Sequence, residues 1–394
     1  MPTQSTDVVS SPYGIAYTAA NQTWKILKGV SVQGDSAGVY SAYANSKLIN
    51  NGSILGEVAV YFMGSGGTSD YVVENQKKGE INGEYGVVAA GFLGSLLIDN
   101  AGEIGGLQFG IYVPMFDAAV KIVNTGEVDG GAIGFYSVGS GAVSIENHGE
   151  ISGGQAGVAM QMVNPDSPAP KIDNYGTIKG FQAGVYLLGD VDGMAKVINH
   201  KGAKIESPEI GILSQDGLKV VNQGKIEGHI LTGDSQDKVI NKGKISGYTA
   251  LGGDDDVFKS SGKNAKAGIL DTGGGNDLVV LGKNADKLLF NTELNALTNV
   301  DTVKKFESGK DKFYLDDDVF STITPGTLSS SAFHKGTSAA DADDRIIYDK
   351  KSGALYYDPD GVGGVGQTQF AKLDGGPKLK AGDFTVGEYS LPLV

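Results

Sequence analysis

Aspartates in glycine-rich turns are the residues of this sequence with the clearest potential for chemistry. Asp237, Asp256 and Asp277 are separated by 19 and 21 residues, and each begins a triplet of Asp, any residue and a large apolar residue. A further triplet begins at Asp286, nine residues after Asp277. Glycine lets a turn present its carbonyl oxygens and aspartate adds a carboxylate, so such turns can surround a hard cation with oxygen ligands. The pattern therefore predicts calcium-binding turns.

Three segments carry this pattern: LTGDSQDKVIN, LGGDDDVFKSS and DTGGGNDLVVLGKNADKLLFN. They resemble the nonapeptide G-G-x-G-x-D-x-U-x of the RTX calcium-binding proteins, in which U is a large apolar residue. The resemblance implies Ca²⁺ as the cofactor. The residues that would contribute side-chain or backbone ligands are Gly233, Asp234, Asp237, Gly252, Asp254, Asp256, Gly273, Gly275, Asp277, Asn284 and Asp286.

The sequence departs from the RTX pattern in several turns. Ser235, Asp254 and Asn284 replace Gly at fourth positions, and Lys266 stands where an Asp is expected. We therefore expect only about two to four calcium ions. Asp256 alone is expected to lie between two stacked aspartates, Asp237 and Asp277 on the neighbouring coils, where the carboxylates would repel one another without a cation. The alternative interpretation is a set of ordinary Gly- and Asp-rich turns.

A long repeat indicates the scaffold that positions these turns. In each repeat an apolar strand ends in Asn, followed by Gly and then Ile or Val, as in SIENHGEISG. Successive repeats are 23 to 27 residues apart, except for a last interval of 19. A period of this size predicts one backbone coil per repeat. The repeated residues are Asn50, Asn75, Asn100, Asn124, Asn147, Asn174, Asn199, Asn222 and Asn241.

Each coil is predicted to contain three short strands. The first strand has a β-branched residue two positions after the repeat's Gly, and these residues form one column of the core. A second strand is marked by a Gly followed by an apolar residue, such as Gly134-Phe135, and a third by a Lys followed by an apolar residue, such as Lys171-Ile172. No helical period is present. The fold class is therefore all-β, a parallel β-helix (β-solenoid) that continues into a calcium-binding β-roll. The corner Asn side chains are expected to form a structural amide ladder.

The repeat pattern divides the chain into four predicted parts. Residues 1–23 form an N-terminal segment or cap, residues 24–230 the parallel β-helix, residues 231–292 the RTX-like coils, and residues 293–394 a small β-rich C-terminal domain. Within the last part, RIIYDKKSGALYYD alternates around a Lys-Ser-Gly turn and predicts a β-hairpin.

The last hundred residues resemble the C-terminal region of RTX proteins that are exported by type I secretion systems. The segments concerned include VKKFESGKDKFYLDDDVFSTITPGTLSSSAF and ADADDRIIYDKKSGALYYDPDGVGG. The resemblance implies an uncleaved export signal that ends in Leu391, Leu393 and Val394. It also implies the type I secretion machinery as a partner, and a Gram-negative bacterium as the source. The expected location is outside the cell or on its surface.

Composition excludes several other classes of protein. The formal net charge is −14, which disfavours nucleic acid as a partner. The chain has no Cys, so neither disulfides nor Cys-based metal sites can hold it together. No apolar segment is long enough to predict a transmembrane span. The N-terminal 20 residues lack the basic and apolar regions of a cleaved secretory signal.

Few residues suggest catalysis. The only Arg is Arg345, outside the solenoid repeat, and Asp190 and Asp192 form the best carboxylate pair. A solvated turn explains this pair better than a catalytic site does. We therefore expect a protein that is not an enzyme. The alternative is a polysaccharide lyase or epimerase, or a glycan-binding protein, built on the β-helix.

Two outward-facing rows are candidate partner contacts. The aromatic row contains Tyr40, Tyr112, Tyr136 and Tyr186. The basic row contains Lys196, Lys219 and Lys238. The aromatic row could stack on sugar rings or a second protomer, although stacking between the tyrosines themselves is favoured. The basic row could bind an acidic polysaccharide, with a solvated face as the default. The expected function is a structural or adhesive protein that folds with calcium after export. Self-association is expected through the N-terminal end of the solenoid, which only residues 1–23 cover.

Overall fold

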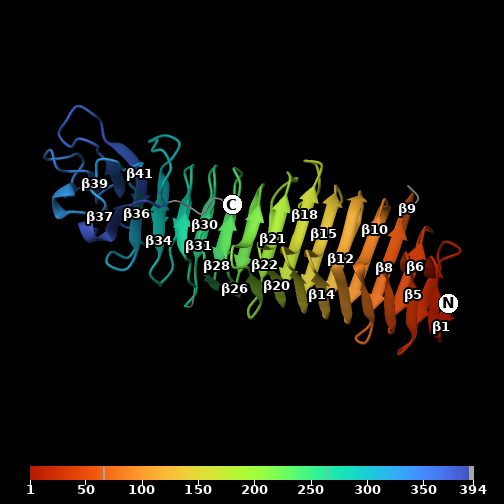
Figure 1. The fold of residues 1–394 in the computed structure, drawn as a ribbon. Helices are drawn as coiled ribbons and strands as arrows, with labels where there is room; N and C mark the ends of the chain where they lie inside the picture. The colour runs from red at the N-terminus through yellow and green to blue at the C-terminus, as the bar shows by residue number, and fades with distance from the viewer. Residues whose placement is uncertain (65–66, 264, 390–394) are drawn as a thin grey trace. The chain divides into compact units, whose positions relative to one another are not determined.

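The computed structural model describes residues 1–64, 67–263 and 265–389 of the chain. It confirms the predicted fold class: the protein is all-β and forms a parallel β-solenoid of about 13 turns (Figure 1). The chain divides into two compact units, of which unit 1 contains Met1–Asp216 and Gly224–Gly228. Unit 2 contains Gly217–Gln223 and His229–Val394. Leu391, Leu393 and Val394, which end the predicted export signal, lie outside the described residues.

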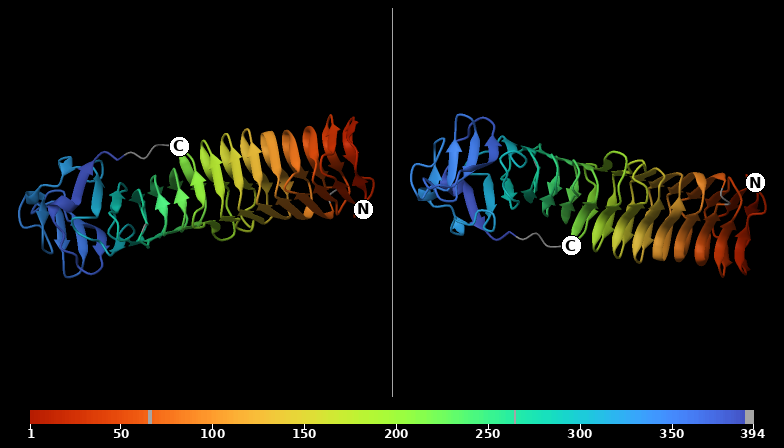
Figure 2. Two further views of the ribbon diagram at one scale, coloured as in Figure 1. Left: turned by 90° about the horizontal axis from the view of Figure 1, so that it is seen from below. Right: turned by 90° about the horizontal axis from the view of Figure 1, so that it is seen from above.

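Unit 1 has three stacks of parallel strands, as the sequence predicts (Figures 1 and 2). The first stack contains β1 (Thr3–Gln4), β4 (Thr23–Ile26), β7 (Lys47–Asn50), β9 (Thr68–Asn75), β11 (Leu93–Asn100), β13 (Ala119–Asn124), β16 (Val143–Asn147), β19 (Lys171–Asn174) and β22 (Ala195–Asn199). The second contains β2 (Val8–Ser10), β5 (Ser31–Gly34), β14 (Glu127–Gly130), β17 (Glu150–Gly153), β20 (Thr177–Gly180), β23 (Lys204–Glu206) and β26 (Lys225–Ile226). The third contains β3 (Tyr13–Ala16), β6 (Ala37–Ser41), β15 (Ile133–Gly139), β18 (Ala156–Met162), β21 (Ala183–Leu188) and β24 (Ile210–Ser214). Three long strands contribute to both the second and the third stack: β8 (Ser53–Met63), β10 (Glu80–Ala90) and β12 (Glu103–Phe116).

Apolar columns fill the inside of unit 1. Ile104, Val128 and Ile151 are fully buried and pair in register along the second stack. Burial of such a side chain stabilises the fold by about 1.5 to 3 kcal/mol relative to exposure. Glycine is needed where the stacks meet, because a Cβ on Gly134 would lie 2.5 Å from the Ser152 carbonyl oxygen of the next coil.

The corner asparagines of unit 1 form the predicted amide ladder, which we call the amide column. It runs from Asn50 to Asn199, and each Nδ2 donates to the Oδ1 of the next Asn at 2.8–2.9 Å. Each Nδ2 also donates to a backbone carbonyl of the next coil, as Asn124 does to Glu150 at 2.9 Å. All seven side chains are at most 1% exposed. Their role is therefore structural, because the amides satisfy one another inside the coil.

The first coils of unit 2 contain fewer residues than those of unit 1, with Asp237, Asp256 and Asp277 only 19 and 21 residues apart. Its first stack contains β25 (Leu218–Asn222), β28 (Lys238–Asn241), β31 (Val257–Ser260), β33 (Leu278–Val280), β35 (Asp301–Lys304) and β41 (Thr368–Leu373). Its second stack contains β27 (His229–Leu231), β30 (Thr249–Ala250), β32 (Ile269–Asp271), β34 (Lys287–Phe290), β36 (Lys312–Asp316) and β42 (Phe384–Gly387). The short strand β29 (Lys244–Ile245) belongs to a third face. Both stacks cross the predicted boundary at residue 292.

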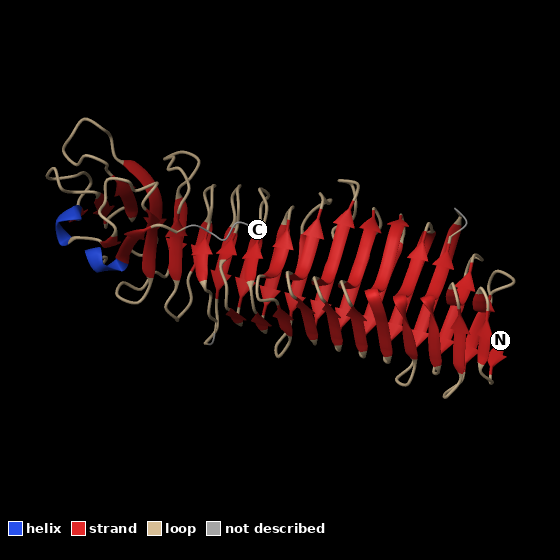
Figure 3. Cartoon of the chain, in the orientation of Figure 1, coloured by secondary structure: helices blue, strands red, loops and turns tan. Residues whose placement is uncertain are grey.

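The C-terminal part of unit 2 adds shorter elements to these stacks. The strands β39 (Ile346–Asp349) and β40 (Ala354–Tyr357) form the predicted antiparallel hairpin. The remaining elements are β37 (Gly326–Thr327), β38 (Phe333–His334) and two short helical turns, η1 (Ser330–Ala332) and η2 (Ala381–Asp383) (Figure 3). The hairpin is thus confirmed, and its membership of an export domain stays a prediction.

The segment of residues 1–23 forms strands of the solenoid. β1, β2 and β3 pair in parallel with β4, β5 and β6, so the segment supplies one strand to each stack. Each of these three strands has one paired neighbour within the described residues. They therefore present unpaired backbone groups along one edge.

Candidate metal centre

Four aspartates of unit 2 lie in register where the strands of its first stack begin. Asp237, Asp256 and Asp277 directly precede β28, β31 and β33, and Asp301 is the first residue of β35. Each is 1% exposed. We call these four residues the carboxylate column. The structure thus brings together the three aspartates predicted to stack and adds a fourth.

Backbone N–H groups hold one oxygen of every carboxylate in this column. The N–H of Asp237 donates to Asp256 Oδ1, and that of Asp256 donates to Asp277 Oδ1, both at 2.7 Å. The N–H of Asp277 donates to Asp301 Oδ1 at 3.2 Å, and Leu218 donates to Asp237 Oδ1. Every side chain therefore reaches to the coil before it.

The other oxygen lacks such a partner at two positions. Asp256 Oδ2 and Asp277 Oδ2 are buried and accept no hydrogen bond within the described structure. Asp301 Oδ2 differs, because it accepts a hydrogen bond from Thr272 Oγ1 at 2.6 Å. A buried carboxylate oxygen without a partner is costly, since it has lost its hydration without replacement. The middle of the column therefore needs a proton or a cation.

Burial raises the pKa values of Asp256, Asp277 and Asp301 and so favours their protonated forms. The pKa of Asp256 is raised to about 8, chiefly because burial removes the carboxylate from water. The hydrogen bond from the Asp237 N–H lowers this pKa, and the charge of the Asp237 side chain raises it. The pKa values of Asp277 and Asp301 are also raised, chiefly by burial, and the charge of Asp301 adds to the shift at Asp277. Without a cation, the column therefore retains protons at neutral pH.

The turns that lead into the column offer carbonyl oxygens. Gly252 and Gly273 both have φ of +81°, and a Cβ on Gly273 would lie 1.8 Å from the Gly252 carbonyl oxygen. A Cβ on Gly275 would lie 2.1 Å from the carbonyl oxygen of Asp254. Successive turns are thus stacked with carbonyl oxygens between them, and only glycine fits. Carboxylate and carbonyl oxygens are the ligand types that calcium prefers, so the residues fit this ion.

A second, shorter carboxylate pair lies at the start of the other stack of unit 2. The N–H of Asp286 donates to Asp311 Oδ1 at 3.0 Å, while Asp286 Oδ1 is buried and accepts no hydrogen bond within the described residues. Burial raises the pKa of Asp286 to about 6 and also raises that of Asp311. This pair repeats the arrangement of the longer column.

The other predicted ligand residues lie in the turns, outside both sets of buried carboxylates, and the charge of Asp254 adds to the rise in the pKa of Asp256. Asp234 and Asp254 are exposed turn residues, and Asp254 has a left-handed backbone with φ of +67°. Gly233 lies in the turn stacked under Gly252. The Asn284 amide nitrogen donates to the Ala265 carbonyl of the preceding coil. Across the described residues no group of three His, Asp or Glu side chains could hold a metal by itself, so calcium would need backbone ligands.

Sequence reasoning missed Asp301 and Asp311. Both begin the same triplet that marks the other sites, as Asp301-Thr302-Val303 and Asp311-Lys312-Phe313. Their separations from Asp277 and Asp286 are 24 and 25 residues, which obscured the shorter period. One expectation needs correction as a result: Asp277 also has a stacked aspartate on each side, so Asp256 is not unique in this respect.

The candidate partner residues lie where the sequence places them. Tyr112 and Tyr136 pair in register and their rings stack at 5.5 Å, whereas Ala159 separates Tyr136 from Tyr186. Tyr40 stacks on Tyr13 at 4.3 Å. Of the four predicted tyrosines, only Tyr112 and Tyr136 stack on each other within the described structure. Partner binding by this row stays a prediction.

The lysines of the basic row belong to both units. Lys196 pairs in register with Lys171 in unit 1, and Lys219 with Lys238 in unit 2. Lys171 has a salt bridge to Asp173 at 2.5 Å. This paired carboxylate weakens the case for an uninterrupted basic row in unit 1.

No protein-family description and no curated protein matches this chain. The helices in the described part of the chain are too short and too polar to cross a bilayer.

Proposed function

We propose that this protein is a calcium-binding β-solenoid that acts outside the cell as a structural or adhesive component. The observation that carries the proposal is the carboxylate column, in which Asp256 and Asp277 each bury an unpartnered oxygen. An ionised carboxylate can only accept hydrogen bonds, so stacked carboxylates cannot satisfy one another unless one of them keeps a proton. Calcium between successive turns would neutralise them and complete its shell with turn carbonyls.

The proposed site couples folding to the surroundings of the protein. Extracellular calcium modules bind with dissociation constants of roughly 10⁻⁴ to 10⁻³ M, far above the level of free calcium in a cytoplasm. Unit 2 would therefore lack its cations before export and acquire them afterwards, when binding adds to folding free energy. This order suits passage of an unfolded chain through a type I secretion system, as the resemblance of residues 293–394 implies.

Thermal unfolding with excess calcium and with chelator tests the proposal. We expect chelation to lower the melting temperature of unit 2. Asp277→Ala should lose most of the calcium-induced rise, because Asp277 lies between Asp256 and Asp301. Asp190→Ala is the matched control, since Asp190 is an exposed turn residue of unit 1. An identical wild-type melting profile in calcium and in chelator would rule out the proposed site.

The residues considered for catalysis favour a role other than that of an enzyme. The only arginine, Arg345, donates from Nη1 to the backbone carbonyls of Ala342 and Asp344 at 2.7 and 2.8 Å. It is thus engaged in a turn, and Asp190 is exposed to solvent. Incubation with uronate-rich polysaccharides tests the alternative of a lyase or epimerase. New unsaturated ends or a changed uronate composition would make the protein an enzyme.

Self-association is the second part of the proposed role. The edge formed by β1, β2 and β3 offers unpaired backbone groups to another chain. We expect light scattering to detect oligomers that grow with protein concentration in calcium. A strict monomer at high concentration would argue against assembly through this edge.

A further inference from the structure

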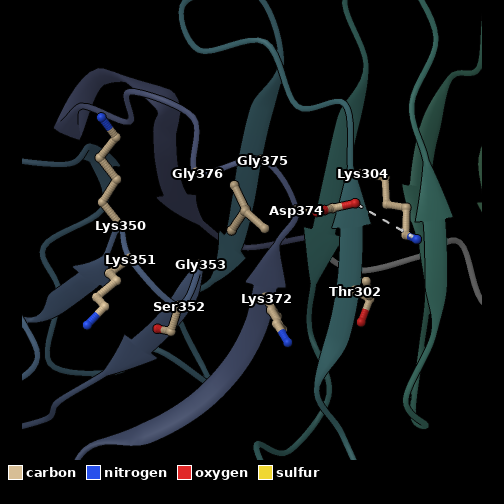
Figure 4. A pocket seen from close by; sticks show the side chains of 11 residues that line it. Thr302, Lys304, Lys350, Lys351, Ser352, Gly353, Lys372, Asp374, Gly375 and Gly376 are labelled. Atoms are coloured by element: carbon tan, nitrogen blue, oxygen red, sulfur yellow. Dashed lines mark ion pairs between the residues drawn. The ribbon is translucent and has the colours of Figure 1, made fainter.

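A pocket of about 550 Å³ in unit 2 is lined by four lysines (Figure 4). It lies along β35 and β41, next to the hairpin turn of residues 350–353 and the turn at Gly375 and Gly376. Its lysines are Lys304, Lys350, Lys351 and Lys372, and Asp374 is its only acidic lining residue. This gathering of positive charge contrasts with the net charge of −14 of the whole chain.

Strand register and turn geometry place these lysines around one pocket, and Figure 4 shows their side chains pointing in different directions. Thr302 and Lys372 are paired residues of neighbouring parallel strands, and Lys304 is two residues further along β35 on the same outward face. The pairing of Asp349 with Ala354 closes the hairpin and puts Lys350 and Lys351 in its turn.

Glycine allows a second turn to pack against this hairpin. Gly375 and Gly376 have φ of +84° and +53°, values that favour glycine. A Cβ on Gly376 would lie 2.9 Å from the Lys350 carbonyl oxygen. Two separate turns therefore line one pocket.

The positive charge of the pocket is only weakly compensated. Lys304 Nζ lies 3.9 Å from Asp374 Oδ2, and both side chains are largely exposed, so this pair contributes little. Lys350, Lys351 and Lys372 have no salt bridge among the described residues. The nearby Asp349 carboxylate accepts hydrogen bonds from Ser352 Oγ and the Lys351 N–H, and these bonds lower its pKa.

The remaining lining groups are suited to a hydrated ligand. Thr302 and Ser352 supply hydroxyl groups, and the N–H groups of Gly375 and Gly376 donate to no protein acceptor in the described structure. The apolar lining residue Leu373 is only 1% exposed. The pocket thus offers ammonium groups, backbone amides and the Thr302 hydroxyl, and it presents no exposed aliphatic or aromatic side chain for a lipid tail.

We propose that this pocket binds the carboxylate or sulfate groups of an acidic polysaccharide. Lysine ammonium groups bind such oxyanions as mobile point charges, and the long side chains can follow a repeating series of them. The Thr302 hydroxyl would contact sugar hydroxyls between the charges, whereas the Ser352 hydroxyl already donates to Asp349. This inference gives the proposed adhesive role a ligand and in that sense rests on it, but its residues are separate from the carboxylate column.

Binding of heparin and hyaluronan to the full chain, measured by calorimetry in excess calcium, tests the inference. We expect binding to both glycans, no binding to neutral dextran, and at least a tenfold loss of affinity in Lys350→Gln/Lys351→Gln/Lys372→Gln. The control is Lys77→Gln/Lys78→Gln/Lys179→Gln, which makes the same charge change at exposed lysines of unit 1. It should bind like the wild type.

Several outcomes would overturn the inference. Equal losses in the two triple variants would mean non-specific attraction by charge. Binding of inorganic phosphate without either glycan would make the pocket a small-anion site, and binding only to anionic phospholipid vesicles would make it a membrane contact. If the triple variant does not fold, the single variant Lys351→Glu replaces it in the test. Lys351 is exposed, and we expect this variant to weaken binding as well.

The glycan test and the calcium test can fail separately. Melting of the lysine variants in calcium and in chelator should match that of the wild type, because substitutions of exposed side chains seldom change stability. Loss of glycan binding with an intact calcium response therefore supports the pocket. An intact calcium response without any glycan binding in the wild type would contradict the pocket alone.

Discussion

The amide column of unit 1 and the carboxylate column of unit 2 both stack buried polar side chains along the coils, but the side chains differ in whether they can hydrogen-bond one another. In unit 1, Asn124 Oδ1 accepts from Asn100 while its Nδ2 donates to Asn147, so every amide is both donor and acceptor. In unit 2, Asp256 and Asp277 accept from backbone N–H groups and keep a buried oxygen unpartnered. A column of amides is complete within the chain, whereas a column of carboxylates requires a proton or a cation.

Asn147→Asp should have the largest effect, because it places a carboxylate in a column built for amides. Asn147 Nδ2 now donates to Asn174 Oδ1 at 2.8 Å and to the Thr177 carbonyl at 2.9 Å, and Asp cannot make either bond. We expect a loss of about 4 kcal/mol in the free energy of unfolding of unit 1.

Chemical denaturation of this variant checks the expectation, and added calcium should not restore its stability. Asn164→Asp is the control, since exposed Asn164 acts only as an acceptor for the Asp166 N–H at 3.0 Å. A loss in Asn147→Asp no larger than in this control would mean that the amide column does not stabilise unit 1.

The converse exchange, Asp256→Asn, should separate calcium binding from folding. An amide is neutral without binding a proton, so it does not repel Asp237 at any pH, and it supplies a donor in a region crowded with oxygen atoms. We expect a higher melting temperature than the wild type in chelator and a much smaller rise with calcium. Asp318→Asn, at an exposed position, should behave as the wild type. An unchanged calcium response in Asp256→Asn would exclude this aspartate as a ligand.

The pH dependence of stability should have opposite signs with and without calcium. The pKa of Asp256 is raised from 3.8 to about 8 in the folded, metal-free protein, so the folded state binds more protons than the unfolded state between these values. Stability without calcium should therefore fall as the pH rises from about 4 to about 8. With calcium bound, the carboxylates are ionised and protons compete with the ion, so stability should fall as the pH decreases.

Melting temperatures in chelator and in calcium across this pH range check both signs. A shift of several degrees is expected in each direction. The same slope in both conditions would mean that calcium does not bind the titrating carboxylates.

The aromatic row should show the smallest effect, because it is half-exposed and needs no partner. Tyr136→Leu removes the ring stacked on Tyr112 at 5.5 Å and should cost about 1 kcal/mol, independent of calcium. Tyr186→Leu is the matched control, since its paired neighbours are Ala159 and Leu213. Equal costs in thermal unfolding would mean that ring stacking adds nothing to this row.

The sequence predicted the solenoid well because its signals are local and repeated. The Asn-x-Gly-x-Ile motif specifies both the turn and the next core residue. Because the motif repeats, each coil pairs in register with the coil that follows it. Asp237, Asp256 and Asp277 were predicted to stack for the same reason.

Other features depend on distances that no short motif contains. Asp301 joins its column after a 24-residue interval, because the loop that precedes β35 lengthens the coil. The lysine pocket combines β35, a hairpin turn and the Gly375 turn, which are far apart in the sequence. Residue type alone could not predict either of them.

The direction of the hydrogen bonds in the amide column gives unit 1 a polarity. From Asn50 to Asn199 every Nδ2 donates toward the later coil, so the side-chain dipoles add head to tail as peptide dipoles do in a helix. Aligned bonds polarise one another, and an amide in the middle is strengthened from both sides. Such a column has no preferred length, since a coil gained or lost as a whole leaves each remaining amide with an identical neighbour.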